Sequence, residues 1–187
     1  QHISHSVSPM IMTAQLIKHS DPTAKCVFIG PCASKKAEFK LPKTGGAIDC
    51  VMSFEELQAF LDARGIDTVD CEDTVLDNGS FYGRIFAKSG GIVQGLLDVA
   101  KELNVEGLKP IVMSGIDECK ANLMKLKFGK ATENFFEGMA CEGGCLNGPL
   151  CITHSPRNIV DVDKYGSEAK EKTIYNSVKL YEMTQDK

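Results

Sequence analysis

Residues Cys26 to Phe39 read CVFIGPCASKKAEF, an apolar run that stops at Gly30-Pro31 and passes into a polar segment. A short apolar run bounded by turn residues is typical of a buried strand, and the proline disfavours its continuation. The spacing therefore predicts a buried strand with Cys32 just after its carboxyl end. Open α/β sheets bind their ligands at that end of their strands.

Helix and strand patterns alternate along the rest of the chain. Ser53 with Glu56 three residues later forms a capping box, which predicts that a helix begins there. Helices are predicted over residues 10–19, 53–64, 91–104 and 116–127, and strands at residues 26–30, 47–52, 111–115 and 134–139. We therefore expect an α/β fold with a parallel sheet flanked by helices on both faces.

Less regular segments lie between these elements and at the end of the chain. Residues 71–91 are rich in Asp, Gly and Ser and are predicted to form a long loop. A further short helix is expected to begin between residues 146 and 153. We assign residues 1–160 to one α/β domain and residues 161–187 to a charged tail.

Composition excludes several classes of function. The net charge is -4 and the 21 Lys and Arg residues are scattered, so we expect no nucleic-acid partner. No apolar run approaches the roughly 20 residues that cross a bilayer, and the start lacks a signal core, which predicts a cytoplasmic protein without a membrane partner. Because the chain opens on Gln1, we expect it to be a domain of a longer polypeptide.

Eight cysteines are many for a reduced protein of this size, so metal or cluster ligation is the first hypothesis. Cys141 and Cys145 are separated by Glu-Gly-Gly, a spacing that suits zinc or an iron-sulfur cluster and equally two unrelated buried thiols. Beyond Cys32, an ammonium at Lys35 could donate to an anionic ligand and a carboxylate at Glu38 could pass protons. Both are also ordinary charges of a solvated helix start.

Three segments together resemble iron-only hydrogenases. FIGPCASKKAEF (28–39) resembles the second signature of that family, and EGMACEGGCLNG (137–148) resembles the third. Between them GRIFAKSGGIVQG (83–95) is similar to the family's Gly-x-Ile-Phe-x-x-x-Gly-Gly segment, and HISHSVSPM (2–10) resembles the stretch after the first signature. The resemblance extends to about Arg157.

The resemblance implies one lobe of a hydrogenase catalytic domain with a six-iron H-cluster. Cys32, Cys141 and Cys145 would hold its 4Fe-4S cubane, with Cys145 the thiolate shared with a diiron unit that carries carbonyl and cyanide ligands. Lys35 would donate a hydrogen bond to a cyanide, and Glu38 would belong to a proton route or support the site. The other residues placed around the cofactor are Pro31, Ser34, Phe86 and Met139.

The sequence departs from the family pattern in three places. The first signature, Thr-Ser-Cys-Cys-Pro, is absent, so we expect an upstream segment of the parent protein to supply the fourth cysteine. Gly30 replaces a Met, and residues 147–150 replace a Gly-Gly-Gln-Pro run, which is closer to the sensory branch of the family. The chain alone is therefore expected to hold an incomplete cluster or none and to be inactive.

Three functions are compatible with these patterns. The first is a part of a hydrogenase that oxidises or senses hydrogen or reduces protons, with a redox partner such as ferredoxin. The second is a non-catalytic relative that serves iron-sulfur cluster assembly or acts as a scaffold. The third is a structural zinc module whose ligands are Cys32, Cys141, Cys145 and Cys151.

Overall fold

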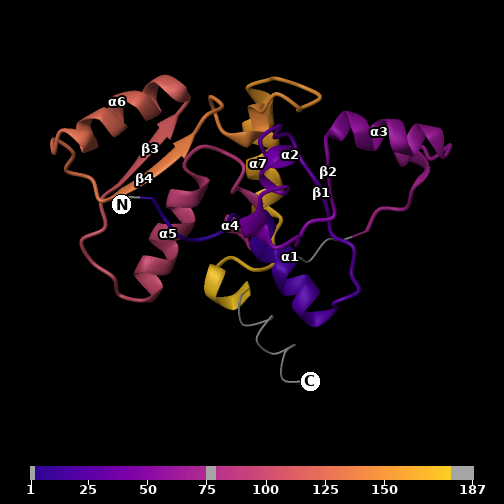
Figure 1. The fold of residues 1–187 in the computed structure, drawn as a ribbon, viewed down its shortest axis with the longest axis horizontal. Helices are drawn as coiled ribbons and strands as arrows, with labels where there is room; N and C mark the ends of the chain where they lie inside the picture. The colour runs from indigo at the N-terminus through magenta and orange to yellow at the C-terminus, as the bar shows by residue number, and fades with distance from the viewer. Residues whose placement is uncertain (1–2, 75–78, 178–187) are drawn as a thin grey trace. The chain divides into compact units, whose positions relative to one another are not determined.

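The computed structural model describes residues 3–74 and 79–177, which group into two compact units. Unit 1 contains residues up to Cys71 together with Pro149–Ile152. Unit 2 contains Glu72–Gly148 and the residues from Thr153 onward. Each unit holds one pair of parallel strands with helices packed beside it (Figure 1).

In unit 1, strand β1 (Val27–Ile29) pairs in parallel with β2 (Cys50–Met52). Helix α1 (Pro9–Ser20) opens with a proline, whose fixed φ suits the first helical turn, and ends in a basic turn that complements the helix dipole. The helix and the strand pair share one apolar core, made of Met10, Ile11, Ala14, Cys26, Ala47, Ile48 and Val51.

Helix α3 (Phe54–Ala63) directly follows β2. Ser53 Oγ accepts a hydrogen bond from Glu56 N at 3.1 Å, and Glu56 Oε2 accepts one from Ser53 N at 2.7 Å. The predicted capping box is therefore present. Two shorter helical segments, α2 (Lys35–Glu38) and a 3-10 turn (Pro42–Thr44), lie between the two strands in the sequence.

In unit 2, strand β3 (Pro110–Ser114) pairs in parallel with β4 (Phe135–Met139). Helices α5 (Gly91–Glu102) and α6 (Ile116–Lys127) both contact this pair and lie on opposite sides of it (Figure 1). The order strand, helix, strand gives β3, α6 and β4 the parallel crossover that the sequence predicts.

Helices α4 (Phe81–Arg84) and α7 (Arg157–Ser167) pack against each other in unit 2. A Cβ at Gly166 would lie 2.6 Å from the side chain of Ile85, so only glycine permits this close approach. Helix α7 includes residue 160, which is where the sequence analysis places a domain boundary. That boundary stays a prediction.

The structure confirms the α/β class and the long helices and differs from the sequence predictions elsewhere. The strand at residues 26–30 was expected to be buried on both faces, but Val27 is 51% exposed and Ile29 is 39% exposed. Strand residues alternate between faces, and only Phe28 points to the core that α1 covers. The prediction of a buried strand is therefore wrong for β1.

Two further predictions fail for local reasons. The helix expected from residues 146–153 is only a 3-10 turn, Cys145–Asn147, because Gly148 precedes a proline and adopts an extended conformation. The predicted loop over residues 71–91 contains α4, which begins where Ser80 Oγ accepts a hydrogen bond from Gly83 N. Residues 75–78 of that loop lie outside the described residues.

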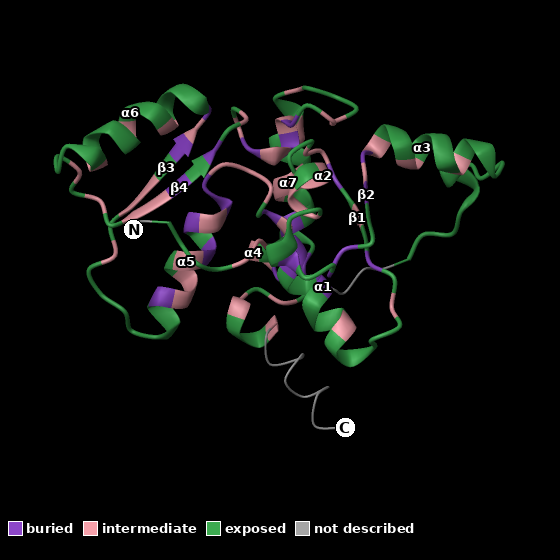
Figure 2. Cartoon of the chain, viewed as in Figure 1, coloured by how far each residue is buried: buried purple, intermediate pink, exposed green. Residues whose placement is uncertain are grey.

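Burial is uneven among the elements. Figure 2 shows buried positions in α1 and α5, whereas α3 and α6 are mainly exposed or half-buried. In unit 2 the buried residues include Ile85, Met113 and Met139, which lie around the carboxyl end of the β3–β4 pair and the segment before α5. The best-packed part of this unit is therefore next to the segment that carries two of the candidate cysteines.

Candidate functional site

Cys32 lies two residues beyond the hydrogen-bonded end of β1. Gly30 N donates to Met52 O at 3.0 Å, which extends the parallel ladder by one residue, and the chain then turns at Pro31. The carbonyl of Cys32 accepts a hydrogen bond from Lys35 N at 3.2 Å, so the residue leads directly into α2. Its half-buried thiol is thus fixed at the carboxyl end of a strand.

Lys35 and Glu38 form an ion pair on α2. Lys35 Nζ lies 2.5 Å from Glu38 Oε2, and both side chains are about three-quarters buried, at 24% and 25% exposed. Burial acts to raise the pKa of the Glu38 carboxyl, but the hydrogen bond and charge of Lys35, with smaller contributions from Ser8 and Lys43, hold the pKa below its usual value. Glu38 is therefore ionised at neutral pH and paired with Lys35.

The other residues expected around the cofactor lie in different settings. Pro31 O accepts a hydrogen bond from Leu150 N at 3.1 Å, within unit 1. Ser34 is exposed at the amino end of α2. In unit 2, Phe86 is 36% exposed, whereas Met139 is buried at the carboxyl end of β4.

The segment from Cys141 to Cys145 forms a tight turn after β4. Both cysteines are half-buried. Gly144 N donates to Cys141 O at 3.1 Å, and Gly143 and Gly144 have φ angles of 79° and 104°. Side chains other than glycine rarely adopt such angles, so the two glycines permit a turn that carries one thiol at each end.

Residues that precede α5 hold this turn from one side. Lys88 and Gly144 form an antiparallel bridge, and Ser89 N donates to Gly143 O at 3.0 Å. The backbones approach so closely that a Cβ at Gly144 would lie 2.5 Å from both Ala87 O and Ser89 N. The turn that joins the two cysteines is therefore packed against the chain and is part of the folded unit.

Two polar residues that the sequence analysis did not single out also support this region. Glu137, which is 2% exposed on β4, accepts hydrogen bonds from Gly90 N at 2.7 Å and Val93 N at 2.8 Å. These amides lie at the start of α5, where a helix favours negative charge. Ser114 accepts a hydrogen bond from Gly143 N at 2.8 Å. A glutamate inside the apolar strand FFEGM was the available signal for Glu137, because unpaired charges are seldom buried.

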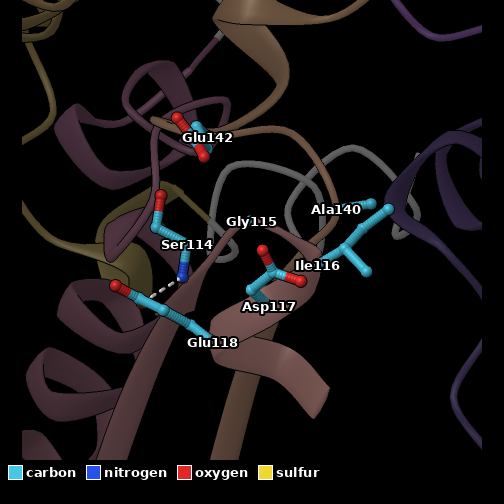
Figure 3. Close-up of a pocket in the computed structure, with 7 residues that line it drawn as sticks. All are labelled: Ser114, Gly115, Ile116, Asp117, Glu118, Ala140 and Glu142. Carbon is cyan, nitrogen blue, oxygen red and sulfur yellow. Dashed lines mark hydrogen bonds between the residues drawn. The ribbon is translucent and has the colours of Figure 1, made fainter. Parts of the chain in front are cut away.

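An open pocket of about 550 Å³ lies at the carboxyl end of the β3–β4 pair and the start of α6 (Figure 3). Ala140 and Glu142, which flank Cys141 in the sequence, contribute to its wall. The residues that line it are 114–118, 140 and 142. Its acidic side chains make it a poor receptor for anions.

The candidate ligands are divided between the two units, with Cys32 in unit 1 and Cys141 and Cys145 in unit 2. Within each unit, the described residues contain no group of three His, Cys, Asp or Glu side chains that could hold a metal ion. In chemistry the donors fit an iron-sulfur cluster, because thiolates are its usual ligands and a glycine turn presents two of them.

The family model for the iron only hydrogenase large subunit, C-terminal domain, matches residues 1–149. This chain belongs to that family. Its relatives include iron hydrogenase 1 from Clostridium pasteurianum, 27% identical over 80% of this chain and 32% of the relative. The periplasmic Fe hydrogenase large subunit of Nitratidesulfovibrio vulgaris is 27% identical over 79% of this chain and 45% of the relative.

A protein named as a cytosolic Fe-S cluster assembly factor, from Anopheles gambiae, is 23% identical over 65% of this chain and 34% of its own length. The chain thus spans 32–45% of the length of these curated relatives. The resemblance to iron-only hydrogenases is confirmed, and the activity of the whole relatives is a matter for proposal.

Solved FeFe-hydrogenases share the fold. One, from work on oxygen inactivation of the enzyme, superposes with a TM-score of 0.66 at 17% identity and covers 97% of this chain and 64% of its own. HydA1 from Chlamydomonas reinhardtii gives a TM-score of 0.67 at 19% identity, with 97% and 65% covered. These likenesses confirm the α/β fold of a FeFe-hydrogenase domain.

Among the helices within residues 3–74 and 79–177, none combines the length and apolar character needed to cross a bilayer. The cytoplasmic location stays a prediction, and one hydrogenase relative is named as periplasmic.

Proposed function

We propose that this chain supplies three ligands of an H-cluster in an iron-only hydrogenase-type protein. Cys32, Cys141 and Cys145 would bind the 4Fe-4S cubane, with Cys145 shared with the diiron unit. The observation that carries the proposal is the family match across residues 1–149, which includes all three cysteines. The hydrogen-bonded glycine turn between Cys141 and Cys145 supports it, because cluster ligands need a fixed spacing.

When bound, the cofactor would supply the redox and hydride chemistry of hydrogen oxidation, proton reduction or hydrogen sensing. The protein would contribute burial, orientation and hydrogen bonds. Met139 is buried two residues before Cys141 and would shield the site from water. Phe86, Pro31 and Ser34 would border the same site.

Lys35 would donate a hydrogen bond to an anionic ligand of the diiron unit. An ammonium carries three N–H donors, so the bond to Glu38 leaves it able to serve a second acceptor. The lowered pKa of Glu38 favours a role in holding Lys35 rather than in carrying a proton, because a proton carrier works best with a pKa near the operating pH.

The fourth cubane ligand would come from residues that precede this sequence in the parent protein, and a ferredoxin-like protein would exchange electrons with it. The test is iron, acid-labile sulfide and visible spectra after anaerobic reconstitution of the chain and of a form extended at its amino end. We expect about four irons in the extended form only, as a four-cysteine cubane requires. Infrared bands of metal-bound carbonyl and cyanide after maturation would then establish the diiron unit.

Cysteine variants assign the ligands in the same experiment. Cys32→Ser, Cys141→Ser and Cys145→Ser should each lower iron uptake sharply, whereas Cys50→Ser, at an exposed thiol on β2, should leave it unchanged. Stoichiometric zinc or no iron in the extended form would refute the proposal. A cubane without the diatomic bands after maturation would leave an assembly or scaffold protein.

A further inference from the structure

Two serines hold the middle of the turn between Cys141 and Cys145. Gly143 N donates to Ser114 Oγ at 2.8 Å, and Gly143 O accepts from Ser89 N at 3.0 Å. The hydroxyls of the two serines lie 3.2 Å apart, with Ser89 Oγ donating to Ser114 Oγ. Both polar groups of the Gly143 backbone are therefore bound, and their partners are bound to each other. We call Ser89 and Ser114 the serine clamp.

The serine clamp is anchored on regular structure. Ser114 is the last residue of β3, and its N–H donates to Glu118 Oε2 on α6 at 2.8 Å. Ser89 precedes Gly90, whose N–H donates to buried Glu137 on β4 at 2.7 Å. The two serines therefore connect the cysteine turn to both strands and to the starts of both long helices of unit 2.

We propose that Ser114 and Ser89 are positioning residues that hold the Cys141 and Cys145 thiolates in the arrangement that a cluster requires. This inference rests on the proposed function. A turn with two consecutive glycines loses much conformational freedom when it is ordered, so it needs external partners to stay in one geometry. Side chains that orient metal ligands typically affect metal affinity about 10- to 100-fold when they are removed.

Ser114 is the member of the clamp that can be tested most cleanly. Its Oγ accepts from Gly143 N and from Ser89 Oγ, which uses both acceptor positions of a hydroxyl. Ser114→Ala removes both bonds and leaves the Gly143 N–H without its acceptor. Ser114→Thr keeps the hydroxyl, and its added methyl group has room because Ser114 borders the open pocket of Figure 3.

The first measurement uses the protein before iron loading. We expect the Gly143 amide to exchange hydrogen with solvent about tenfold faster in Ser114→Ala, as loss of one hydrogen bond implies, and near the normal rate in Ser114→Thr. Ser167→Ala removes a hydroxyl that donates to Lys164 O within helix α7 of unit 2 and is the control, with no change at Gly143. Unchanged exchange in Ser114→Ala would refute the clamp.

The second measurement uses the loaded, extended protein and follows loss of visible absorbance to an iron chelator. We expect Ser114→Ala to release iron about 10- to 100-fold faster. Ser114→Thr should restore the normal rate, and Ser167→Ala should match the unaltered protein. Faster Gly143 exchange with unchanged iron release would overturn the positioning role. If the unaltered protein binds no iron, the proposed function fails and the positioning role fails with it, while Gly143 exchange still decides whether the clamp exists.

Discussion

Lys35 Nζ lies 2.5 Å from Glu38 Oε2, one turn further along α2. Burial alone would raise the pKa of Glu38, and the Lys35 hydrogen bond and charge reverse that effect. We therefore predict that Lys35→Met raises the pKa of Glu38 above its present value, because burial then acts with less opposition. The carboxyl carbon shift of Glu38, followed by NMR as pH is lowered, measures it.

Lys36→Met is the matched control for this substitution. Lys36 is the next residue but pairs with Glu56, at 2.5 and 2.6 Å, and contributes to the lowered pKa of that carboxyl. Lys36→Met should raise the pKa of Glu56 and leave the pKa of Glu38 unchanged. Equal shifts of Glu38 in the two variants would contradict the specific pairing.

Asp49 makes the stability of unit 1 depend on acidic pH. A hydrogen bond from Lys18, at 2.9 Å, and one from Cys26 N lower the pKa of Asp49 from 3.8 to about 2. Because the folded pKa is the lower one, the unfolded chain takes up the proton first as pH falls, and the contribution of Asp49 is lost between about pH 4 and pH 2. Asp49→Asn should flatten this part of the stability profile, measured by urea unfolding.

The two lysines near Asp49 should differ in how strongly they lower its pKa. Lys18 is the closer partner, and Lys25 lies 3.4 Å away with an exposed side chain. Lys18→Met should therefore weaken the acid dependence more than Lys25→Met does. The reverse order would show that the hydrogen bond from Lys18 is not the main cause of the lowered pKa.

The capping box at α3 predicts a stability loss that a single substitution can measure. Ser53→Ala removes the hydroxyl that accepts from Glu56 N and should lower the free energy of unfolding by about 1 kcal/mol. Ser34 occupies the same position on α2 without a capping hydrogen bond, so Ser34→Ala should cost much less. Equal shifts in the midpoint of urea unfolding would argue against the cap.

Local sequence signals predicted the elements whose ends are set by nearby residues. Helix α3 begins at its capping box, and α6 spans Ile116–Lys127 as predicted, with acidic residues in its first turn and basic residues in its last. The exposed face of β1 was not predictable in this way. An apolar run does not reveal which of its faces another segment will cover, and Val27 and Ile29 belong to the uncovered face.

The residues of the candidate site likewise differ in whether the sequence alone could reveal them. The two cysteine segments and Lys35 with Glu38 could be found in the sequence because each is a short motif. Ser114 lies 29 residues before Gly143, and only the pairing of β3 with β4 brings the two together. Contacts of this kind depend on tertiary packing, and a single sequence has no local pattern that indicates them.

Glu137 should be important for the stability of unit 2. Glu137→Ala would leave the amides of Gly90 and Val93 without acceptors in a buried place, at a cost of about 3 kcal/mol or more. Glu137→Gln should lower the stability less, because one side-chain oxygen can still accept a hydrogen bond. The NH2 group of the glutamine would still face one of the two N–H donors, so some loss remains. Glu106→Ala, at an exposed glutamate, is the control. Urea unfolding and amide exchange at the start of α5 measure these effects, and a Glu137→Ala variant as stable as the control would contradict them.

Gly144 should tolerate alanine worse than another glycine with a positive φ. Gly144, with φ 104° and ψ -169°, lies in a region that is essentially restricted to glycine, and Gly107 has a φ of 79°, so alanine is strained at both positions. Around Gly107 nothing lies within 4 Å of an added Cβ, whereas at Gly144 the Cβ would lie 2.5 Å from Ala87 O and Ser89 N. Because those atoms are backbone, the turn must shift, which typically adds about 1–3 kcal/mol. The unfolding free energies of Gly144→Ala and Gly107→Ala should differ by at least that amount, and the Ser89 and Gly143 amide signals should move only in the former. Equal losses of unfolding free energy would mean that the turn shifts at little cost to accommodate a side chain. A turn that shifts so easily would not hold two thiolates at a fixed spacing.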